Sequence, residues 1–532
     1  MTDIRPYDLP PNVFSSGVNV RFENGTVSRG PVPLLVCDFS TVNSTFTPSH
    51  IFTLPQVSAG AETIVAVASD YSKIYTVVGN TYTDATPAGL SVGNTGEAFT
   101  NTDLGGLVYL NRKSNVPLYK SSVSSTFATL PAWDSTWRCG SLRAYKDFLI
   151  ALDVRKGAVE YPSLVKWSDI TPFGAPPPSW DHTVTTNSAG ENIINQMRGK
   201  LIDGEVLRDT FMLYSENEVW AMSYIGGDFI FDFRKRFDDL GIISSNCVVE
   251  VDGQHFVFTG NDIIAHDGSS KRSIVHGRNK NFIFQSLNPD RKSLCFVSHN
   301  PKLNEIHFCY PSRDRLCGFN ETALGCNRAA VYNYRRDNWT FYDLPNVTAA
   351  TYAGVSSGLN YGSPEVVTYE TMGGSYVSTG TTSDRFQLYA SAKDTAQNIT
   401  KSRIVGMDII VGSTLPRPIV TELVRDAFAE RVGIDLDEDG AEISSYKSIL
   451  KVYPQVAVSG GLTDSISFQF GANDVSGIEP IWDEVQAFTP TVNYQLSLRK
   501  AGRYLAHRIR RSGVYDFAYS GFDATITKRG RQ

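Results

Sequence analysis

Short runs of Val, Ile, Tyr, Phe and Thr dominate the chain, and Gly, Asn, Asp and Ser punctuate them at close intervals. Such runs are typical of β-strands bounded by turns, and the 3.6-residue period of an amphipathic helix is rare in this sequence. The clearest hairpin lies near the start, where residues 18–22 alternate, Asn24-Gly25 tolerates positive φ at both turn positions, and residues 26–28 return. The pattern therefore predicts a mainly β protein.

A degenerate repeat runs through residues 50–375. Each unit offers an apolar strand, a polar turn and a second strand that carries aromatic residues, as in residues 63–67 with 73–77. Two units end on the pattern Phe-x-x-Leu-Pro, at 127–131 and 341–345. Antiparallel units of roughly 40–50 residues, each too small to bury its own faces, are typical of a β-propeller, and we expect an irregular one of about five to seven blades. A pair of β-sandwiches is the alternative, since short strands at irregular spacing fit it too.

The composition changes after the repeat, where a small polar stretch at 371–384 suits a boundary. We divide the chain into an N-terminal hairpin region at 1–45, a propeller-like domain at 46–375 and a C-terminal region at 376–532. The last region contains the best helical pattern of the chain, near 418–432, where a proline can occupy the first turn and a glycine follows the apolar face. The other segments there resemble strands, so we expect an α+β region with a sheet that pairs with the N-terminal hairpin.

Composition and charge narrow the function. The 532 residues are 41% hydrophobic and 20% charged, which excludes disorder of the whole chain. Lys and Arg total 49 against 55 Asp and Glu, and the net charge of −6 argues against a generic nucleic-acid binder. No run of about twenty apolar residues occurs and the N-terminus lacks a leader pattern, so we expect a soluble protein made in the cytoplasm.

The charge is unevenly distributed. Nine basic and two acidic side chains give residues 499–532 a charge of +7, which leaves residues 1–498 at −13. A basic end on an acidic body suggests contact with an acidic partner or between unlike surfaces of subunits, and a solvated strand face is the alternative. The candidate contact residues are Arg503, Arg508, Arg510 and Arg511.

Matches to catalytic motifs lack the context that the chemistry needs. The pattern G-x-S-x-G occurs at 89–93 and 354–358, but no helix is predicted after either serine, so both are interpreted as turns. Asp238 and Asp239 could be the paired carboxylates of a glycosidase, yet adjacent residues on a strand point to opposite faces. We assign no catalytic residue and no cofactor, and we expect a protein that is not an enzyme.

Metal-binding patterns are incomplete. Asp435, Asp437 and Asp439 match the first half of a calcium loop, but Tyr446 stands where a bidentate Glu is needed, so a solvated acidic loop is the alternative. Among the seven cysteines, the local cluster has no CxxC knuckle to share a zinc ion, and we expect reduced, structural thiols. This cluster consists of Cys309, Cys317 and Cys326. His255 and His266 flank a predicted hairpin and are expected to be packed rather than metal-bound.

Several strings resemble the tail proteins of short-tailed bacteriophages. They are DLPPNVFSSGVNVRFENG at 8–25, VKWSD at 165–169, the run 208–267 with YIGGDF and NCVVEVDGQHFVF, and the C-terminal AGRYLAHRI and YSGFDATI. The chain is similar in these strings to the podovirus tail nozzle family, the tail tubular protein B group.

That resemblance implies a β-propeller inserted in a platform domain, with residues 1–45 and 376–532 forming the platform. It implies a hexameric ring beneath the portal and its adaptor, with tail fibre or spike proteins as neighbours, in the tail of a virion assembled in the host cytoplasm. Genomic duplex DNA would pass through the ring without sequence-specific binding and without an enzymatic step. The acidic body is compatible with this role, because a basic lining would hold a polyanion by counterion release.

Two other classes of function remain open from the sequence. A propeller glycan-binding protein or glycosidase would place inner-strand carboxylates around a central pocket. A propeller that scaffolds other proteins is the third hypothesis. A monomer that binds or cleaves sugars would support the glycan-directed propeller. A monomer without affinity for sugars would support the scaffold.

Overall fold

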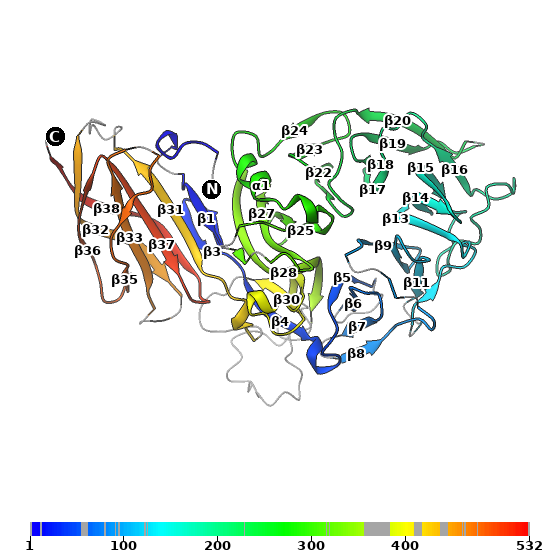
Figure 1. The fold of residues 1–532 in the computed structure, drawn as a ribbon, viewed down its shortest axis with the longest axis horizontal. Helices are drawn as coiled ribbons and strands as arrows, with labels where there is room; N and C mark the ends of the chain where they lie inside the picture. Colours follow the sequence, from blue (N-terminus) through cyan, green and yellow to red (C-terminus); the bar gives the residue numbers. More distant parts are fainter. Residues whose placement is uncertain are drawn as a thin grey trace, which may run out of the picture.

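The protein consists of a ring of small sheets and a β-sandwich beside it (Figure 1). In this computed structural model the described residues are 3–529, apart from 11–12, 55–61, 79–80, 91, 94–95, 122–123, 125, 228, 315–316, 319, 356–383, 409–417, 437–444, 460, 462–463 and 476. Among them, no helix has the length and apolar character needed to cross a membrane. The short helices are α1 (Lys280–Ser286) and the 3₁₀ turns η1 (Pro6–Asp8), η2 (Phe39–Thr41), η3 (Pro289–Leu294), η5 (Thr395–Gln397) and η6 (Thr421–Leu423).

The ring contains seven four-stranded antiparallel units in the described chain, with the first strand of each unit innermost. The first three are β5 (Pro48–Thr53) to β8 (Thr81–Asp84) through β6 (Ile64–Ala68) and β7 (Ile74–Val78); β9 (Phe99–Leu104), β10 (Leu107–Arg112), β11 (Leu118–Ser121) and β12 (Ala128–Thr129); and β13 (Trp137–Tyr145), β14 (Phe148–Lys156), β15 (Val159–Trp167) and β16 (Gly190–Ile193). The next two are β17 (Leu201–Leu207), β18 (Thr210–Ser215), β19 (Val219–Tyr224) and β20 (Phe231–Phe237); and β21 (Val248–Val251), β22 (Gln254–Phe258), β23 (Ile263–His266) and β24 (Lys271–Ser273).

One long strand serves the last two units. The sixth unit is β25 (Phe296–Asn300), β26 (Glu305–Tyr310), β27 (Cys326–Asn333) and the first half of β28 (Asn338–Val355), which is its outermost strand. The second half of β28 then becomes the innermost strand of the seventh unit, followed by β29 (Asp384–Ser391) and β30 (Arg403–Asp408). Propeller pairing therefore continues to residue 408, beyond the boundary that we expected at 375.

The ring is closed by a strand from the other end of the propeller. β4 (Val32–Asp38) directly precedes the first unit in the chain, yet it pairs with β30 as the outermost strand of the seventh unit. The innermost strands β28 and β5 also contact each other. Each unit is too small to bury both of its faces alone, so closing the circle completes the core of every unit. The predicted propeller fold is confirmed, at the upper end of the expected range of blades.

Several inner strands of the ring are buried on both faces, which explains why their sequences are mostly apolar runs. All five residues of β6 and all six of β10 are buried. Their side chains pack between neighbouring units, with Val65 and Val67 of the first unit against Val108 and Leu110 of the second. A strand covered on both sides has no polar face, so its sequence loses the alternation of a half-exposed strand.

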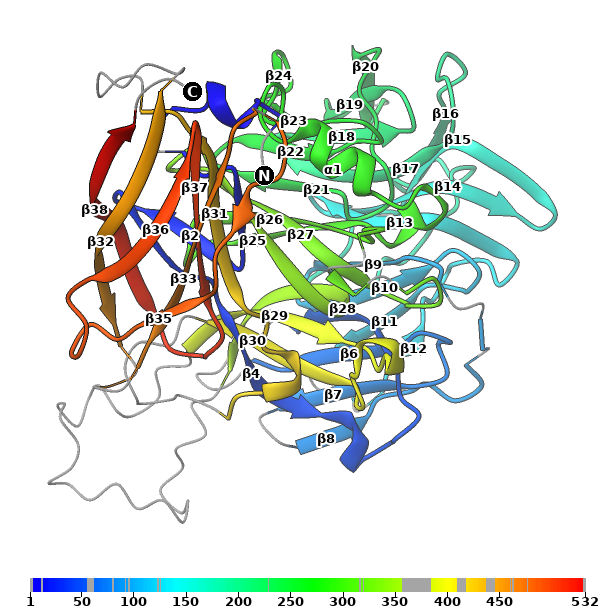
Figure 2. The same cartoon turned by 60° about the vertical axis from the view of Figure 1, so that its left-hand side comes forward.

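The platform is a sandwich of two antiparallel sheets. The first contains β1 (Ser16–Val18), β31 (Ala427–Ile434), β37 (Tyr504–Arg511), β33 (Ile466–Asn473), β34 (Ile481–Trp482) and β35 (Gln486–Phe488). The second contains β2 (Val20–Glu23), β3 (Thr26–Arg29), β38 (Phe517–Arg529), β32 (Tyr446–Val458) and β36 (Leu496–Gly502), and Figure 2 shows several of these strands side by side at its left edge. Val452, Phe468 and Ile509 lie in the core between the sheets.

The expected helix near 418–432 is wrong. Only Thr421–Leu423 form a 3₁₀ turn, and residues 427–434 are strand β31. Ala427, Ala429 and Arg431 face inward at every second position, and β1 and β37 supply hydrogen-bonding partners on both sides. Tertiary pairing thus overrides a local apolar pattern that also fits a helix. The region 376–532 is therefore β rather than α+β within the described residues.

The hairpin predicted at the start is confirmed. β2 and β3 pair across Asn24-Gly25, whose φ values of 50° and 76° fit a two-residue turn with positive φ at both positions. β3 also pairs with β38, so the N-terminal hairpin and the last strand of the described chain lie in one sheet. The propeller is consequently an insertion between two parts of the platform.

Strand β1 connects the platform to the propeller. It pairs with β31 of the platform on one side and with β28 of the propeller on the other, where Val18 lies opposite Phe341. The amide of the next residue, Asn19, donates to the Phe341 carbonyl at 2.7 Å. Behind this strand, Arg21 Nε donates to Glu305 Oε1 at 2.8 Å, and both side chains are buried. One hydrogen-bonded sheet therefore runs through both domains.

One core histidine has no hydrogen-bond partner. Neither ring nitrogen of His507 is bonded among the described residues, and Phe14, Tyr519 and Phe522 surround its ring. Burial, together with the nearby charge of Arg431, lowers the pKa of His507 to about 3. The unfolded chain takes up a proton near pH 6.5, so stability is lost as the pH falls from 6.5 towards 3.

The substitution His507→Phe should therefore protect the fold against acid. It keeps an aromatic ring in the cluster and removes the titration, so the free energy of unfolding should fall between pH 7 and pH 4 by about 3 kcal/mol less than in the unsubstituted protein. Urea unfolding followed by circular dichroism at the two pH values measures the difference. The same substitution at the exposed His276 is the control and should leave that difference unchanged. Equal acid sensitivity of His507→Phe and the unsubstituted protein would contradict the account.

Candidate functional site

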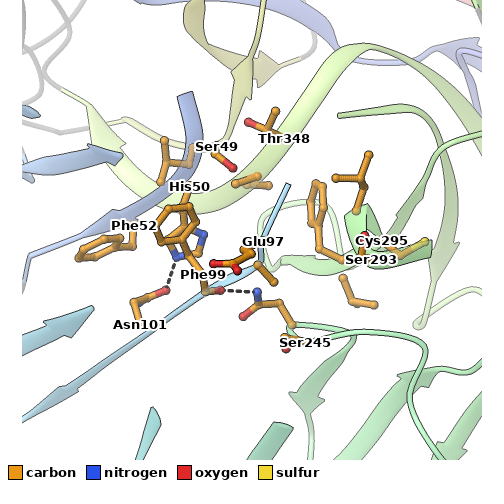
Figure 3. A pocket seen from close by; sticks show the side chains of 18 of the residues that line it. Ser49, His50, Phe52, Glu97, Phe99, Asn101, Ser245, Ser293, Cys295 and Thr348 are labelled. Atoms are coloured by element: carbon orange, nitrogen blue, oxygen red, sulfur yellow. Dashed lines mark hydrogen bonds between the residues drawn. The ribbon is translucent and has the colours of Figure 1, made fainter. Parts of the chain in front are cut away.

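A cavity of ≈220 Å³ lies on the axis of the propeller, and Figure 3 shows its lining from close by. Innermost strands from all seven units contribute to the wall, so the cavity is the central channel of the ring. The representatives of the units, in chain order, are His50, Asn101, Arg143, Glu205, Val248, Phe296 and Thr348. The wall is more polar than the blades behind it, which makes this channel the first place to look for chemistry.

Arg143 of the third unit is bonded to the second unit, the fourth unit and the segment before the fifth. Its guanidinium forms two hydrogen bonds with the buried Asp203 of the fourth unit, at 2.8 and 2.5 Å. It also donates to the Asn101 carbonyl of the second unit at 3.0 Å and to Asn246 Oδ1, before the fifth unit, at 2.8 Å. Asn246 in turn donates to the Phe99 carbonyl at 2.8 Å. This arginine therefore acts as a clamp between neighbouring blades.

The Asp203 carboxylate is fully satisfied. Burial alone would raise the pKa of this carboxyl, but the charge of Arg143 and hydrogen bonds from Arg143, the Asn246 amide and Ser141 outweigh burial and hold the pKa low. A carboxylate without solvent exposure that accepts this many bonds is a structural anion. It is not poised to exchange a proton.

His50 is held neutral on the innermost strand of the first unit. Its Nε2 lies 2.8 Å from Asn101 Oδ1, an acceptor, so Nε2 carries the proton and donates (Figure 3). Burial lowers the pKa of His50 to about 4, with a further contribution from Arg143. The hydrogen bond goes to an amide rather than to a serine or threonine hydroxyl, which is not the arrangement of a base that activates a nucleophile.

Two other carboxylates line the channel. Glu97 accepts from Arg112 Nε at 2.9 Å and from Ser114 Oγ at 2.6 Å, so its charge is paired. Burial raises the pKa of Glu205, the neighbouring Asp203 adds to the rise, and Arg143 opposes it. Glu205 is thus the described channel residue whose carboxyl is closest to the properties of a general acid.

The size of the channel weighs against a small-molecule site. Ligand pockets typically enclose about 300–1,000 Å³, whereas this cavity holds ≈220 Å³. The polar groups of its wall are largely committed to one another, as the Arg143 clamp shows. The geometry therefore favours a structural role for the channel, with Glu205 as the residue to test for any other.

The four arginines expected at a subunit or partner contact are mostly engaged within the chain. Arg508 pairs with Glu430 at 2.7 Å and lies over the ring of Trp482. Arg511 is buried and paired with Asp464, and the exposed Arg510 is paired with Asp426. Arg503 is half-buried. Arg508, Arg510 and Arg511 are thus paired with acidic residues of their own platform.

The calcium-loop candidate cannot be assembled from the described residues. Asp435 follows β31, and Asp437 and Asp439 lie outside the described residues. Among the part of the chain that is described, no group of three or more Asp, Glu, His or Cys side chains is placed to hold a metal ion. The boundary at 371–384 and the serines of both G-x-S-x-G matches also lie outside the described part, apart from residue 384 in β29.

The cysteines and the acidic pair are structural where they are described. All seven cysteines are free and buried, including Cys309, Cys317 and Cys326, and burial raises the pKa of each of these three thiols. Asp238 and Asp239 follow β20 and pair with different lysines, Lys235 and Lys271.

His255 and His266 face each other across β22 and β23 and share the Tyr214 hydroxyl, at 2.6 and 2.8 Å. His255 Nε2 donates to the Val206 carbonyl, so its Nδ1 accepts from the hydroxyl, which in turn accepts from His266 Nε2. Both rings are therefore neutral and packed, as the sequence predicts.

Sequence reasoning missed Arg143, Asp203 and Glu205. The available signal was a polar residue interrupting an apolar strand at the start of a repeat unit, as Arg143 does between Leu142 and Ala144. That signal shows which strands are innermost, but it does not show which residues meet, because Arg143 and Asp203 belong to different units.

No family model matches this chain, and no curated protein matches its sequence. Among solved structures the chain is similar to U3-55K, with a TM-score of 0.39 and 10% identity over 70% of this chain and 98% of that chain. It is also similar to the computationally designed Ika8 protein, with a TM-score of 0.37 and 8% identity over 70% of this chain and all of the designed one. At these scores and identities neither likeness bears on function.

The clamp can be tested by Arg143→Met. Removing the guanidinium leaves Asp203 buried without its cation, so the free energy of unfolding should fall by about 3–5 kcal/mol. The matched control is Arg234→Met, which removes an exposed arginine paired with Asp232 at 2.6 Å and should cost at most about 1 kcal/mol. Guanidinium unfolding of both variants gives the comparison. If both variants lost the same small amount of unfolding free energy, the Arg143 network would not be a clamp.

Proposed function

We propose that this chain is a structural subunit of a short-tailed phage tail, a nozzle component that assembles as a ring. Genomic DNA would be retained and ejected through the centre of that ring. The proposed partners are further copies of the chain, a portal–adaptor complex, tail fibre or spike proteins, and duplex DNA that slides without sequence-specific binding. The site of action would be the tail of the virion.

The observation that carries the proposal is the insertion of the propeller in the platform. The sequence resemblance implies such an insertion, and β3 and β38 of the platform pair with each other from opposite ends of the described chain. The propeller between them is joined to the platform through β1 and β28. In a subunit of this form, one domain can make the contacts of a ring while the other is held in a fixed position beside it.

The DNA path in this proposal runs between subunits rather than through the propeller. The propeller channel of ≈220 Å³ is too small for a duplex, and the Arg143 clamp ties neighbouring parts of its wall together. Arg508, Arg510 and Arg511 are engaged with acidic side chains of the same chain. Arginines paired in this way bind DNA phosphates more weakly. Weak binding is compatible with DNA passing through the ring, because counterion release at free basic residues would hold the DNA in place.

A glycan-directed propeller is the second candidate, and the raised pKa of Glu205 in the central channel favours it. A glycosidase needs a protonated carboxylic acid near neutral pH and a second carboxylate nearby. Glu97 lines the same cavity, but it is paired with Arg112. A propeller scaffold for other proteins has no specific observation in its favour.

The decisive experiment is imaging of the purified protein with and without a portal–adaptor complex of a short-tailed phage. Negative-stain electron microscopy and light scattering on the same samples should give a closed ring with a channel wide enough for duplex DNA. The ring should form in at least one of the two samples. Particles that remain monomeric in both would contradict the proposal, and sugar binding abolished by Glu205→Gln would then establish the glycan-directed alternative.

A further inference from the structure

The edge of the platform is covered with apolar side chains that the chain itself leaves exposed. Residues 475–494 connect β33 to β36 and form the edge of the first sheet farthest from β1. Six large apolar residues in this segment are 55–76% exposed: Val475, Ile478, Ile481, Val485, Val492 and Tyr494. Single exposed apolar residues are ordinary, but a concentration of this kind marks an interaction surface. We call this segment the platform edge.

The platform edge is also acidic. Residues 474–498 contain Asp474, Glu479, Asp483 and Glu484 and no lysine or arginine. Asp483 pairs with Lys500 at 2.9 Å, whereas Asp474, Glu479 and Glu484 are exposed. An apolar surface rimmed by carboxylates selects a partner with apolar contact area and basic side chains.

The outer side of the second platform sheet carries two exposed basic residues and one leucine, with the exposed Asp523 of β38 opposite Tyr453 beside them. On β36, Leu496 and Leu498 point into the core, so Arg499 points away from it. Lys451 of β32 lies opposite Ser497, two residues from Arg499 on the same face. Both basic residues are exposed, and Leu450 beside Lys451 is 36% exposed. We call this the outer face.

We propose that the platform edge of one copy docks on the outer face of the next copy. The contact would bury the apolar edge and set Glu479 and Glu484 against Lys451 and Arg499. It is head-to-tail, since two different surfaces meet, and repeated contacts of this kind close into a ring when the rotation between copies allows it. The inference rests on the proposed ring subunit and names its interface.

The main rival surface within the chain is an apolar patch on the propeller. Ile225 and Phe229, in the loop between β19 and β20, are 58% and 78% exposed, and Phe173 in the loop after β15 is 87% exposed. The exposed charged residues beside these loops have both signs: Asp147, Asp181 and Asp209, and also Lys146 and Arg208, with Lys146 3.8 Å from Asp209. The charge of this patch is therefore mixed, and the substitutions below separate it from the outer face.

Two sets of substitutions test the apolar contribution. Ile481→Ser with Val492→Ser and Tyr494→Ser removes three exposed side chains of the platform edge, and sedimentation velocity over a concentration series should show loss of self-association. The control, Ile225→Ser with Phe229→Ser, removes two exposed side chains from the propeller patch and should associate as the unsubstituted chain does. Circular dichroism confirms that each variant is folded.

Complementary charge reversal tests the head-to-tail contact itself. Variant A carries Glu479→Lys and Glu484→Lys, and variant B carries Lys451→Glu and Arg499→Glu. Each variant alone should sediment as a monomer, because like charges then face each other at every contact. An equal mixture should associate again, since the reversed edge of A matches the reversed face of B and the native edge of B matches the native face of A.

The outcomes separate this interface from the proposed function. Variants A and B that associate separately as the unsubstituted chain does, or loss of association through Ile225→Ser with Phe229→Ser, would overturn the interface while leaving the ring intact. Association that follows the charge rules but gives only open or small oligomers would support the interface and contradict the ring. An unsubstituted chain that stays monomeric throughout the series, both alone and with the portal–adaptor complex, would overturn the interface.

Discussion

The buried pair of Arg21 and Glu305 stands at the point where the platform meets the propeller. Arg21 is 5% exposed on β2 of the platform, and Glu305 is 2% exposed on β26 of the propeller. Burial alone would raise the pKa of Glu305, but His307 and Arg21 outweigh burial and hold the pKa low. Removing one partner of such a pair leaves an uncompensated buried charge, at a typical cost of about 3–5 kcal/mol. The two domains are therefore held in one arrangement by more than their linking segments.

Backbone pairing at the same place makes the connection stiff. β1 is bonded to β28 and β31, and Thr340 Oγ1 donates to the Val20 carbonyl at 2.6 Å. Domain interfaces within a chain are by default mobile unless they are extensive. Here a continuous sheet crosses the interface, so a contact made by the platform fixes the position of the propeller. The proposed ring subunit would require such a coupling.

Local structure could be predicted from the sequence where the residues that determine it are close together in the chain. Asn24-Gly25 specifies its hairpin because both turn positions need positive φ, and buried runs such as residues 64–68 mark strands covered on both faces. The helix expected near 418–432 is absent because its apolar residues fit the spacing of a helix and of a strand equally well. Pairing with β1, about 400 residues earlier in the chain, makes the segment a strand. The closing strand β4 had no local signal for its partner β30. The fold class was predictable, but its long-range pairings were not.

The same limit applied to the candidate site and to the charged C-terminus. Arg143 and Asp203 belong to different blades, so only the closed ring brings them together. The basic excess of residues 499–532 was visible in the sequence, but the carboxylates that neutralise Arg508, Arg510 and Arg511 lie elsewhere in the platform. Net charge along a chain describes a surface only when the ion pairs are known. The exposed apolar edge at 475–494 became recognisable once the core between the two sheets was defined.

The central claim is that the platform and the propeller behave as one body, and native-state hydrogen exchange tests it most directly. The amides of β1 and Asn19 at the junction should be compared with those of β26 in the propeller as denaturant is increased. The account predicts that both sets exchange through the same opening, with equal free energy and equal dependence on denaturant. Exchange of the junction amides through a separate opening of much lower free energy, while β26 stays protected, would contradict it.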